Sequence, residues 1–273
     1  MLKLVSVGDR FPFDRFAEVH SRFERVINFV YKKQVVSLVT PEVGAGPFRI
    51  EIELAELSSV QILEYRAGSV ILNDCLALQA EDNLLYNSSI SFDFKDKDNV
   101  HKGIPFLKEF LLNQKIANSM LFLLTDKAYP VSSKFDAELA KQFRQAYQFL
   151  QKQKYEQAAA SFKGRGYGFT PSGDDFNAGL LIGLQVRQQT EKKELSKIRD
   201  SIYQISLGNS LPVNTLLLQA YKGWYDEPWK NLLFALQSEH QELQSAAEKV
   251  LAQGETSGAD ALTGFLAAWE IKI

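Results

Sequence analysis

The chain has 273 residues, of which 45% are hydrophobic and 23% are charged, and its formal net charge is −2. This is ordinary globular composition, and the small negative charge argues against a general nucleic-acid or membrane-surface binder. No apolar run approaches the ~20 residues that cross a bilayer, and the first residues do not read as a signal peptide. Cys75 is the single cysteine, which favours a reducing compartment. We therefore expect a soluble cytoplasmic protein that binds neither nucleic acid nor membrane.

Residues 1–104 are predicted to form a β-rich domain, barrel- or sandwich-like. Its strand candidates combine β-branched and aromatic residues and are separated by turn-forming residues. The expected strands are 34–40, 48–54, 60–66, 69–74 and 88–94. Segment 13–31 has apolar residues at helical spacing, but its Phe and Val residues also suit strands, so both interpretations stay open. We find no catalytic pattern in this domain.

Residues 105–273 are predicted to form a mainly helical domain, which makes the fold class α+β. The segment 134–153 is typical of it, with an apolar stripe from Phe135 to Leu150 at steps of three and four. The charged segment 94–103 is interpreted as the connector between the domains. Further helices are expected at 105–124, 174–188, 194–206, 213–222, 228–251 and 259–270.

The stretch GRGYGFTPSGDDF, residues 164–176, precedes a segment that is apolar on all sides. Such a helix is expected to be buried, so Asp174 and Asp175 lie at the entrance to a buried helix. Neighbouring helical residues point about 100° apart, and the two carboxylates therefore cannot share one direction. We interpret Asp174 as a helix cap. Asp175, one turn before Gly179, is expected to face inward.

A second stretch, GETSGADALTGFLAAWE at 254–270, repeats this pattern. Both stretches contain Ser-Gly-x-Asp-x-x-x-Gly, and their alignment places Asp175 over Asp260 and Gly179 over Gly264. Ordinary capping is the alternative explanation, but two acidic residues at two buried entrances favour function. We predict that the two helix N-termini converge on one pocket and that Asp175 and Asp260 are catalytic.

Two converging helix N-termini suit an anion, because the first N–H groups are unpaired and that end is positive. Glycine-rich turns and hydroxyls add donors for phosphate or a small anionic metabolite. Arg165 is expected to clamp the anion. The predicted ligand-binding residues are Arg165, Gly166, Gly168, Thr170, Ser172, Gly173, Asp174, Thr256, Ser257 and Gly258.

The cofactor is left unassigned. The first stretch is neither a Walker A loop nor a dinucleotide fingerprint, and the histidines lack zinc-ligand spacing. They also lie far in sequence from both stretches, so nothing predicts a base for a serine nucleophile. The aspartates would orient an amine or amide, hold Mg²⁺, or fix the loops. We therefore predict no metal site, and Mg²⁺ stays a candidate.

The patterns GxGxTPSGDDFxxG and TSGADxLxG together resemble the DUF2877 family of uncharacterised bacterial proteins. Some members are described as a subunit of oxamate carbamoyltransferase, and earlier as carboxylases. The resemblance is strongest over 160–270. Phe169 replaces a usual Leu and Glu255 a frequent His, so the substrate need not be shared. The matching positions are Gly166, Gly168, Thr170, Pro171, Ser172, Gly173, Asp174, Asp175, Gly179, Thr256, Ser257, Gly258, Asp260 and Gly264.

The resemblance implies carbamoyl transfer between carbamoyl phosphate and an amide such as oxamate, with partner subunits contributing. Asp175 or Asp260 would then orient the attacking or leaving nitrogen. The alternative is a non-catalytic metabolite-binding or assembly subunit of a multi-protein complex. A purely structural role for the two stretches is a third possibility.

Overall fold

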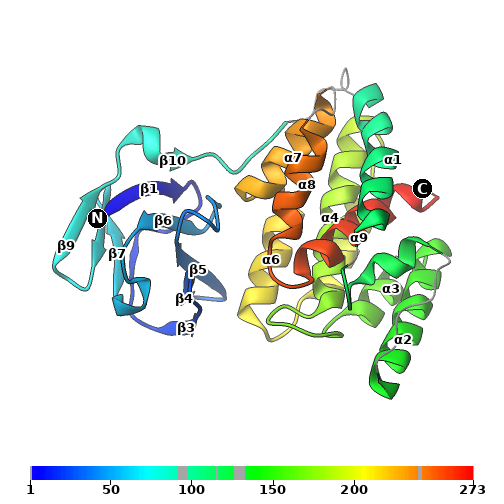
Figure 1. Cartoon of the computed structure of the whole chain (residues 1–273), viewed down its shortest axis with the longest axis horizontal. Helices are drawn as coiled ribbons and strands as arrows, with labels where there is room; N and C mark the ends of the chain where they lie inside the picture. Colours follow the sequence, from blue (N-terminus) through cyan, green and yellow to red (C-terminus); the bar gives the residue numbers. More distant parts are fainter. Residues whose placement is uncertain (1, 92–96, 115, 126–132, 239–241, 273) are drawn as a thin grey trace. The chain divides into compact units, whose positions relative to one another are not determined.

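The computed structural model describes residues 2–91, 97–114, 116–125, 133–238 and 242–272. Within these ranges, strands lie between residues 3 and 86 and α-helices follow from residue 97 (Figure 1), which confirms the predicted α+β class. The chain forms two compact units. The β unit comprises residues 1–90, 210–215 and 224–230, and the helical unit comprises 91–209, 216–223 and 231–273. The domain boundary at residue 104 stays a prediction.

The β unit contains two sheets. The first has the strand order β10-β1-β6-β5-β4-β3, with parallel pairing of β1 with β10 and of β5 with β6. The second has the order β2-β7-β8-β9 and is antiparallel. The strands are β1 (Lys3–Gly8), β2 (Asp14–Phe16), β3 (Val19–Arg22), β4 (Val26–Tyr31), β5 (Gln34–Val39), β6 (Arg49–Glu53), β7 (Leu63–Arg66), β8 (Ser69–Leu72), β9 (Leu76–Gln79) and β10 (Leu85–Tyr86).

Four predicted strands correspond to β5, β6, β7 and β8, while β1, β9 and β10 lie outside every expected segment. Segment 13–31 contains β2, β3 and β4, so its strand interpretation is confirmed and its helical one is wrong. The strand expected at 88–94 does not form over 88–91, and 92–94 lie outside the described residues. Local turns fix the hairpins. Positive φ angles at Ala67 (49°) and Gly68 (74°) give the tight turn between β7 and β8.

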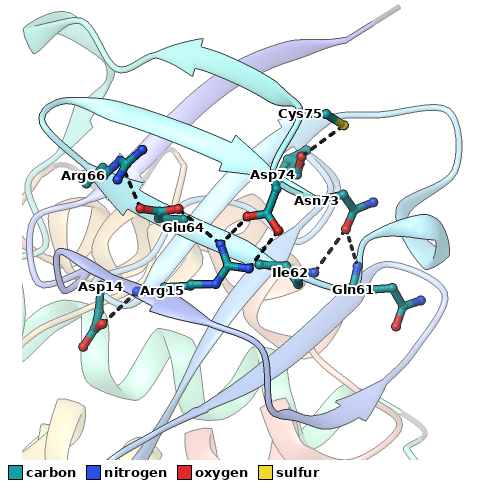
Figure 2. A network of polar contacts seen from close by, with 10 residues as sticks. Asp14, Arg15, Gln61, Ile62, Glu64, Arg66, Asn73, Asp74 and Cys75 are labelled. Atoms are coloured by element: carbon teal, nitrogen blue, oxygen red, sulfur yellow. Dashed lines mark hydrogen bonds and ion pairs between the residues drawn. The ribbon is translucent and has the colours of Figure 1, made fainter.

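A polar network links strand β2 of the second sheet to the turn between β8 and β9 (Figure 2). Arg15 of β2 contacts both carboxylate oxygens of Asp74, whose φ is positive (61°) in the turn between β8 and β9. Next to it, the side-chain oxygen of Asn73 accepts from the N–H groups of Gln61 (2.7 Å) and Ile62 (3.1 Å). These groups are solvent-exposed and tie a turn to its neighbours, so we assign the network a local structural role.

The helices are α1 (Lys97–Asn113), α2 (Lys134–Gln151), α3 (Tyr155–Phe162), α4 (Ser172–Glu191), α5 (Ser196–Ser206), α6 (Leu211–Lys222), α7 (Glu227–Gln237), α8 (Leu243–Leu251) and α9 (Ser257–Glu270), with a 3₁₀ helix η4 (Met120–Leu124).

Two helix predictions and the predicted connector need correction. The helix expected at 105–124 is α1 followed by η4, and α1 already begins at Lys97, so the connector predicted at 94–103 is helical from there. Residues 94–96 lie outside the described ranges. The helix expected at 228–251 is two helices, α7 and α8, and 239–241 are not described. The short helix α3 has no counterpart in the prediction.

Helices α4 and α9 lie side by side and make the most extensive contact of any two elements in the described chain (Figure 1). Two glycines make this approach possible. A Cβ atom on Gly179 would lie 1.7 Å from the carbonyl oxygen of Ala261, and one on Gly264 would lie 2.0 Å from that of Phe176. The alignment of the two stretches places Phe176 over Ala261. The two contacts are therefore equivalent, and the crossing has local two-fold pseudosymmetry.

Each of these helices also packs against the end of the helix before it. A Cβ on Gly173 would lie 2.0 Å from the carbonyl oxygen of Phe162 in α3, and a Cβ on Gly258 would lie 2.0 Å from that of Val250 in α8. The repeated unit is thus a helix, a glycine-containing loop and a second helix. The repeated Ser-Gly-x-Asp-x-x-x-Gly motif is the part of this structural repeat that can be recognised in the sequence.

Candidate functional site

The structure brings the two sequence motifs together. Asp175 and Asp260 are each the fourth residue of their helix, α4 and α9, and they are 2% and 0% exposed. The loops before the two helices also meet, since Thr170 Oγ1 lies 3.5 Å from Ser257 Oγ. The two helix N-termini therefore lie together as predicted, while the pocket on which they were expected to converge stays a prediction. Their proximity follows from the glycine-mediated crossing, which sets each first turn beside the other.

Burial dominates the electrostatics of both aspartates. Desolvation raises the pKa of the Asp260 carboxyl to about 7, although the hydrogen bond from the Met120 N–H and the nearby hydroxyls of Ser172 and Thr256 lower it. Desolvation also raises the pKa of Asp175 well above its usual range, with hydroxyls of Thr170 and Ser257 opposing and the Asp260 charge adding to the rise. Both carboxyls consequently favour the protonated form far more than a surface aspartate does.

The contacts are crossed between the helices. The hydroxyl of Ser257 in α9 lowers the pKa of Asp175 in α4, and the hydroxyl of Ser172 in α4 lowers the pKa of Asp260 in α9. Because the alignment pairs Ser172 with Ser257, these two interactions are equivalent under the pseudosymmetry. The serines are thus partners of the aspartates, as the motif spacing alone could not show.

One carboxyl oxygen on each aspartate lacks a partner. Asp260 Oδ1 accepts a 2.6 Å hydrogen bond from the N–H of Met120, the first residue of η4. Within the described chain, the Oδ2 atoms of Asp175 and Asp260 are buried and have no hydrogen-bond partner. Burying such a group unsatisfied costs ~1–3 kcal/mol, so two of them at one crossing need an explanation.

Asp174 holds the glycine-rich loop. It is the third residue of α4, and both its carboxylate oxygens lie 3.1 Å from the Gly164 nitrogen, whose N–H they accept. The residue at the N-cap is Pro171, which makes no side-chain cap. The interpretation of Asp174 as the helix cap is therefore wrong. The physical reason is that the first donors of α4 are satisfied by main-chain carbonyls, which leaves this carboxylate free to bind the loop.

Several donors expected for an anion are already engaged. The N–H of Gly173 donates to the carbonyl of Arg165 (2.8 Å), and the N–H of Gly258 donates to the carbonyl of Gln253 (3.0 Å). The Arg165 guanidinium donates to Gln142 Oε1 of α2 at 2.9 Å. Anion binding by these groups stays a prediction.

The glycine-rich loop has a backbone that other residues resist. Gly164, Gly166 and Gly168 have φ angles of 68°, 107° and 99°, values that favour glycine. A Cβ on Gly166 would lie 2.7 Å from the Cβ of Ser172. Between these glycines, Tyr167 donates from its hydroxyl to Asp136 Oδ1 of α2 at 2.8 Å. This contact joins residues far apart in sequence, and no local signal predicts it.

Thr256 and Ser257 are half-buried at the start of α9, and Thr170 is half-buried at the end of the glycine-rich loop. Ser172, by contrast, is 2% exposed. Four hydroxyl residues thus lie near the buried carboxyl pair, and three of them are partly exposed to solvent.

Among the residues that the structure describes, no cluster of three or more His, Cys, Asp or Glu residues is placed to hold a metal ion. Over the same residues, no helix combines the length and apolar character that crossing a membrane requires.

Comparison with known proteins finds a resemblance to one family in this region. Residues 162–269 match the family model described as oxamate carbamoyltransferase subunit AllH. No curated protein and no solved structure gives a significant match. The matched segment starts at the last residue of α3 and reaches into the end of α9, so it contains both motifs and both buried aspartates. The resemblance predicted from the two motifs is thus confirmed, and residues 162–269 of this chain are similar to the AllH family of oxamate carbamoyltransferase subunits.

Proposed function

We propose that this chain is a subunit of a carbamoyltransferase and that Asp175 and Asp260 act on the nitrogen that receives the carbamoyl group. The family match over residues 162–269 supports carbamoyl transfer, with oxamate as the acceptor that the family description names. The observation that carries the proposal is the buried carboxyl pair that the α4–α9 crossing brings together from the two ends of this segment, with one unsatisfied oxygen on each aspartate.

The chemistry requires a proton acceptor. The amide nitrogen of the acceptor attacks the carbonyl carbon of carbamoyl phosphate, a C–N bond forms, and the C–O bond to phosphate breaks. The nitrogen loses one proton in this step, and phosphate leaves with the electron pair of the broken bond. A general base works best when its pKa lies near the operating pH. Asp260, whose pKa burial raises to about 7, meets this requirement.

The phosphate group would be held by the loops that precede the two helices. Their half-buried hydroxyls, Thr170, Thr256 and Ser257, are donors of the kind that phosphate accepts. Mg²⁺ stays a candidate cofactor, because it is commonly held by one or two carboxylates together with substrate phosphates. Addition of EDTA to the transfer assay tests this directly.

The function is tested by assembling the chain with its partner subunits and measuring carbamoyl transfer from carbamoyl phosphate to oxamate. Asp260→Asn keeps the acceptor oxygen for the Met120 N–H but cannot take a proton, so we expect turnover to fall ~10²–10⁴-fold, the usual contribution of a general base. Glu255→Gln is the matched control, since Glu255 is exposed in the loop before α9, and its turnover should equal that of the wild type. Wild-type turnover by Asp260→Asn would refute the catalytic role.

A specific observation favours a second candidate, the non-catalytic assembly subunit. Three aromatic side chains around the glycine-rich loop are exposed: Phe135 (59%), Tyr167 (47%) and Phe169 (47%). The rings of Phe135 and Tyr167 contact each other edge to face, with centroids 5.6 Å apart. Exposed aromatic residues are enriched in protein–protein interfaces.

The two candidates differ in the behaviour of the variants. Tyr167→Ser should weaken co-elution with the partner subunits on size-exclusion chromatography if the aromatic group is an interface. Asp260→Asn should leave co-elution intact and remove turnover if the carboxyl pair is catalytic. Loss of assembly in Asp260→Asn, with its fold intact by circular dichroism, would favour the assembly subunit.

A further inference from the structure

The carboxyl pair is closed to solvent in this structure. Asp175 and Asp260 are 2% and 0% exposed, and the Oδ2 atom of each is buried. A molecule that binds these oxygens therefore reaches them only after a neighbouring segment has moved. The helices α4 and α9 are not that segment, because a Cβ on Gly179 would lie 1.7 Å from a carbonyl oxygen of the facing helix. Separating backbones packed so closely would break the core of the helical unit.

The two halves of the pseudosymmetric repeat differ in the loop that leads to the carboxyl pair. Nine residues, 163–171, connect α3 to α4, whereas five residues, 252–256, make the equivalent connection between α8 and α9. The second half shows that five residues suffice to join two helices in this arrangement. The additional length of the first loop is thus not needed for connection, and loops commonly carry function on a rigid scaffold.

The first loop is fixed at both ends and exposed in between. At its start, the carbonyl of Arg165 accepts a 2.8 Å hydrogen bond from the N–H of Gly173. At its end, the carbonyl of Pro171 accepts a 2.8 Å hydrogen bond from the N–H of Asp174. Residues 167–169 between these anchors are exposed. Motion of the loop is therefore confined to its middle.

The loop tip, defined as residues 166–170, connects the surface to the carboxyl pair. Thr170 is half-buried, its hydroxyl interacts with the Asp175 carboxyl, and its Oγ1 lies 3.5 Å from Ser257 Oγ, which is a long and weak contact. Gly166 and Gly168 have φ angles of 107° and 99°. Glycine changes its backbone angles at low steric cost, so these two residues are suited to act as hinges.

A tyrosine ties the loop tip to α2. Tyr167 donates from its hydroxyl to Asp136 Oδ1 at 2.8 Å, and its ring contacts that of Phe135. The acceptor has a fixed position, because Asp136 is 4% exposed and its Oδ2 accepts a 2.7 Å hydrogen bond from Ser133. Tyr167 is 47% exposed, so water can replace Asp136 as the partner of its hydroxyl, and the net cost of breaking this bond is small.

We propose that the loop tip, residues 166–170, is a lid over the carboxyl pair and that Tyr167 and Asp136 form its latch. In the open state the tip has turned about its glycines, and the Tyr167 hydroxyl donates to water. Thr170 has left the carboxyl pair, whose unsatisfied oxygens are then exposed. Closure restores the latch and excludes water from the site. The proposal rests on the proposed function only in taking the carboxyl pair as the place where a ligand binds.

Carboxyl labelling measures the opening on the full chain. The protein is treated with a water-soluble carbodiimide and glycine ethyl ester, and the rate of modification of Asp175 is followed by mass spectrometry. Tyr167→Phe removes the latch hydroxyl and keeps the ring. Loss of one hydrogen bond should raise the open fraction, and with it the rate of Asp175 labelling, about two- to ten-fold. Tyr221→Phe is the matched control, because it removes a 2.7 Å tyrosine–aspartate bond to Asp200 in another part of the helical unit, and it should leave the rate unchanged.

The urea dependence of labelling separates lid opening from global unfolding. Opening of a short loop exposes little surface, so the rate of Asp175 labelling in the wild type should change little with urea below the unfolding transition. Labelling through global unfolding would instead rise steeply with urea. Such a steep rise, an unchanged rate in Tyr167→Phe, or an equal increase in Tyr221→Phe would each overturn the lid.

The outcome is separable from that of the proposed function, because the labelling uses neither carbamoyl phosphate nor partner subunits. Labelling that depends on the latch, without carbamoyl transfer by the assembled subunits, supports the lid and refutes the enzyme. Carbamoyl transfer that depends on Asp260, with labelling that does not depend on the latch, refutes the lid and leaves the function standing.

Discussion

Replacing Asp260 by Asn should make the helical unit more stable at alkaline pH. The Asp260 carboxyl has an ordinary pKa of 3.8, which burial raises to about 7 in the folded chain. Between these two values the folded state binds more protons than the unfolded state, so the free energy of unfolding falls as pH rises. Above pH 7 both states are deprotonated and the effect is constant. The stability that Asp260 provides is therefore greatest in acid and is lost by about pH 7.

The size of the effect follows from the pKa difference. Each pKa unit corresponds to about 1.4 kcal/mol, so the difference between 3.8 and about 7 lowers the free energy of unfolding by roughly 4 kcal/mol across this range. Between pH 5 and pH 8 the share is about 3 kcal/mol. Asparagine stays neutral throughout, and it still offers an oxygen to the Met120 N–H, which lies 2.6 Å from Asp260 Oδ1.

The assay is hydrogen exchange by mass spectrometry on peptides from α4 and α9 at pH 5 and pH 8, corrected for intrinsic exchange rates. A local probe is needed because a chain with two compact units need not unfold in one step. We expect the protection of Asp260→Asn to exceed that of the wild type by about 3 kcal/mol more at pH 8 than at pH 5, while Glu255→Gln follows the wild type at both. Parallel pH dependence of wild type and Asp260→Asn, or lower protection of the variant at pH 8, would show that burial does not raise the pKa of Asp260 into this pH range in the folded chain.

Two further predictions concern stability. Gly264→Ala should destabilise the helical unit by ~1–3 kcal/mol or more, because the new Cβ would lie 2.0 Å from a rigid carbonyl oxygen. The measurement is urea unfolding, and Gly208→Ala is the control, since its Cβ would contact only the flexible Lys163 side chain, with Cε at 3.4 Å. Equal unfolding midpoints for the two variants would contradict the close crossing of α4 and α9. Asp174→Ala should lower the free energy of unfolding by ~1–3 kcal/mol, because it leaves the Gly164 N–H without its acceptor. The variant should also be cleaved faster by a protease in the glycine-rich loop. An unchanged rate of cleavage would mean that the carboxylate does not hold this loop.

The sequence alone determined the parts of the site that depend on local pattern. An apolar segment with no polar face predicts a buried helix, and two such segments begin with Ser-Gly-x-Asp and continue to a glycine one turn later. Both become helices with a buried first turn, α4 and α9. Their meeting could be predicted because glycine at equivalent positions permits two backbones to approach. The resemblance to the AllH family model could be predicted because the matching residues lie in two short stretches of the sequence.

Only the tertiary structure decided how the polar groups are shared. Asp260 is bound by the N–H of Met120, and Arg165 is bound by Gln142, and neither partner is near its residue in sequence. Asp174 accepts a hydrogen bond from the loop and does not cap the helix, because the first N–H groups of α4 already donate to main-chain carbonyls. The crossed serines and the two unsatisfied oxygens exist only once the helices cross. Sequence periodicity reports which face of a helix is buried, whereas the identity of the group that it meets there depends on packing between segments far apart in the chain.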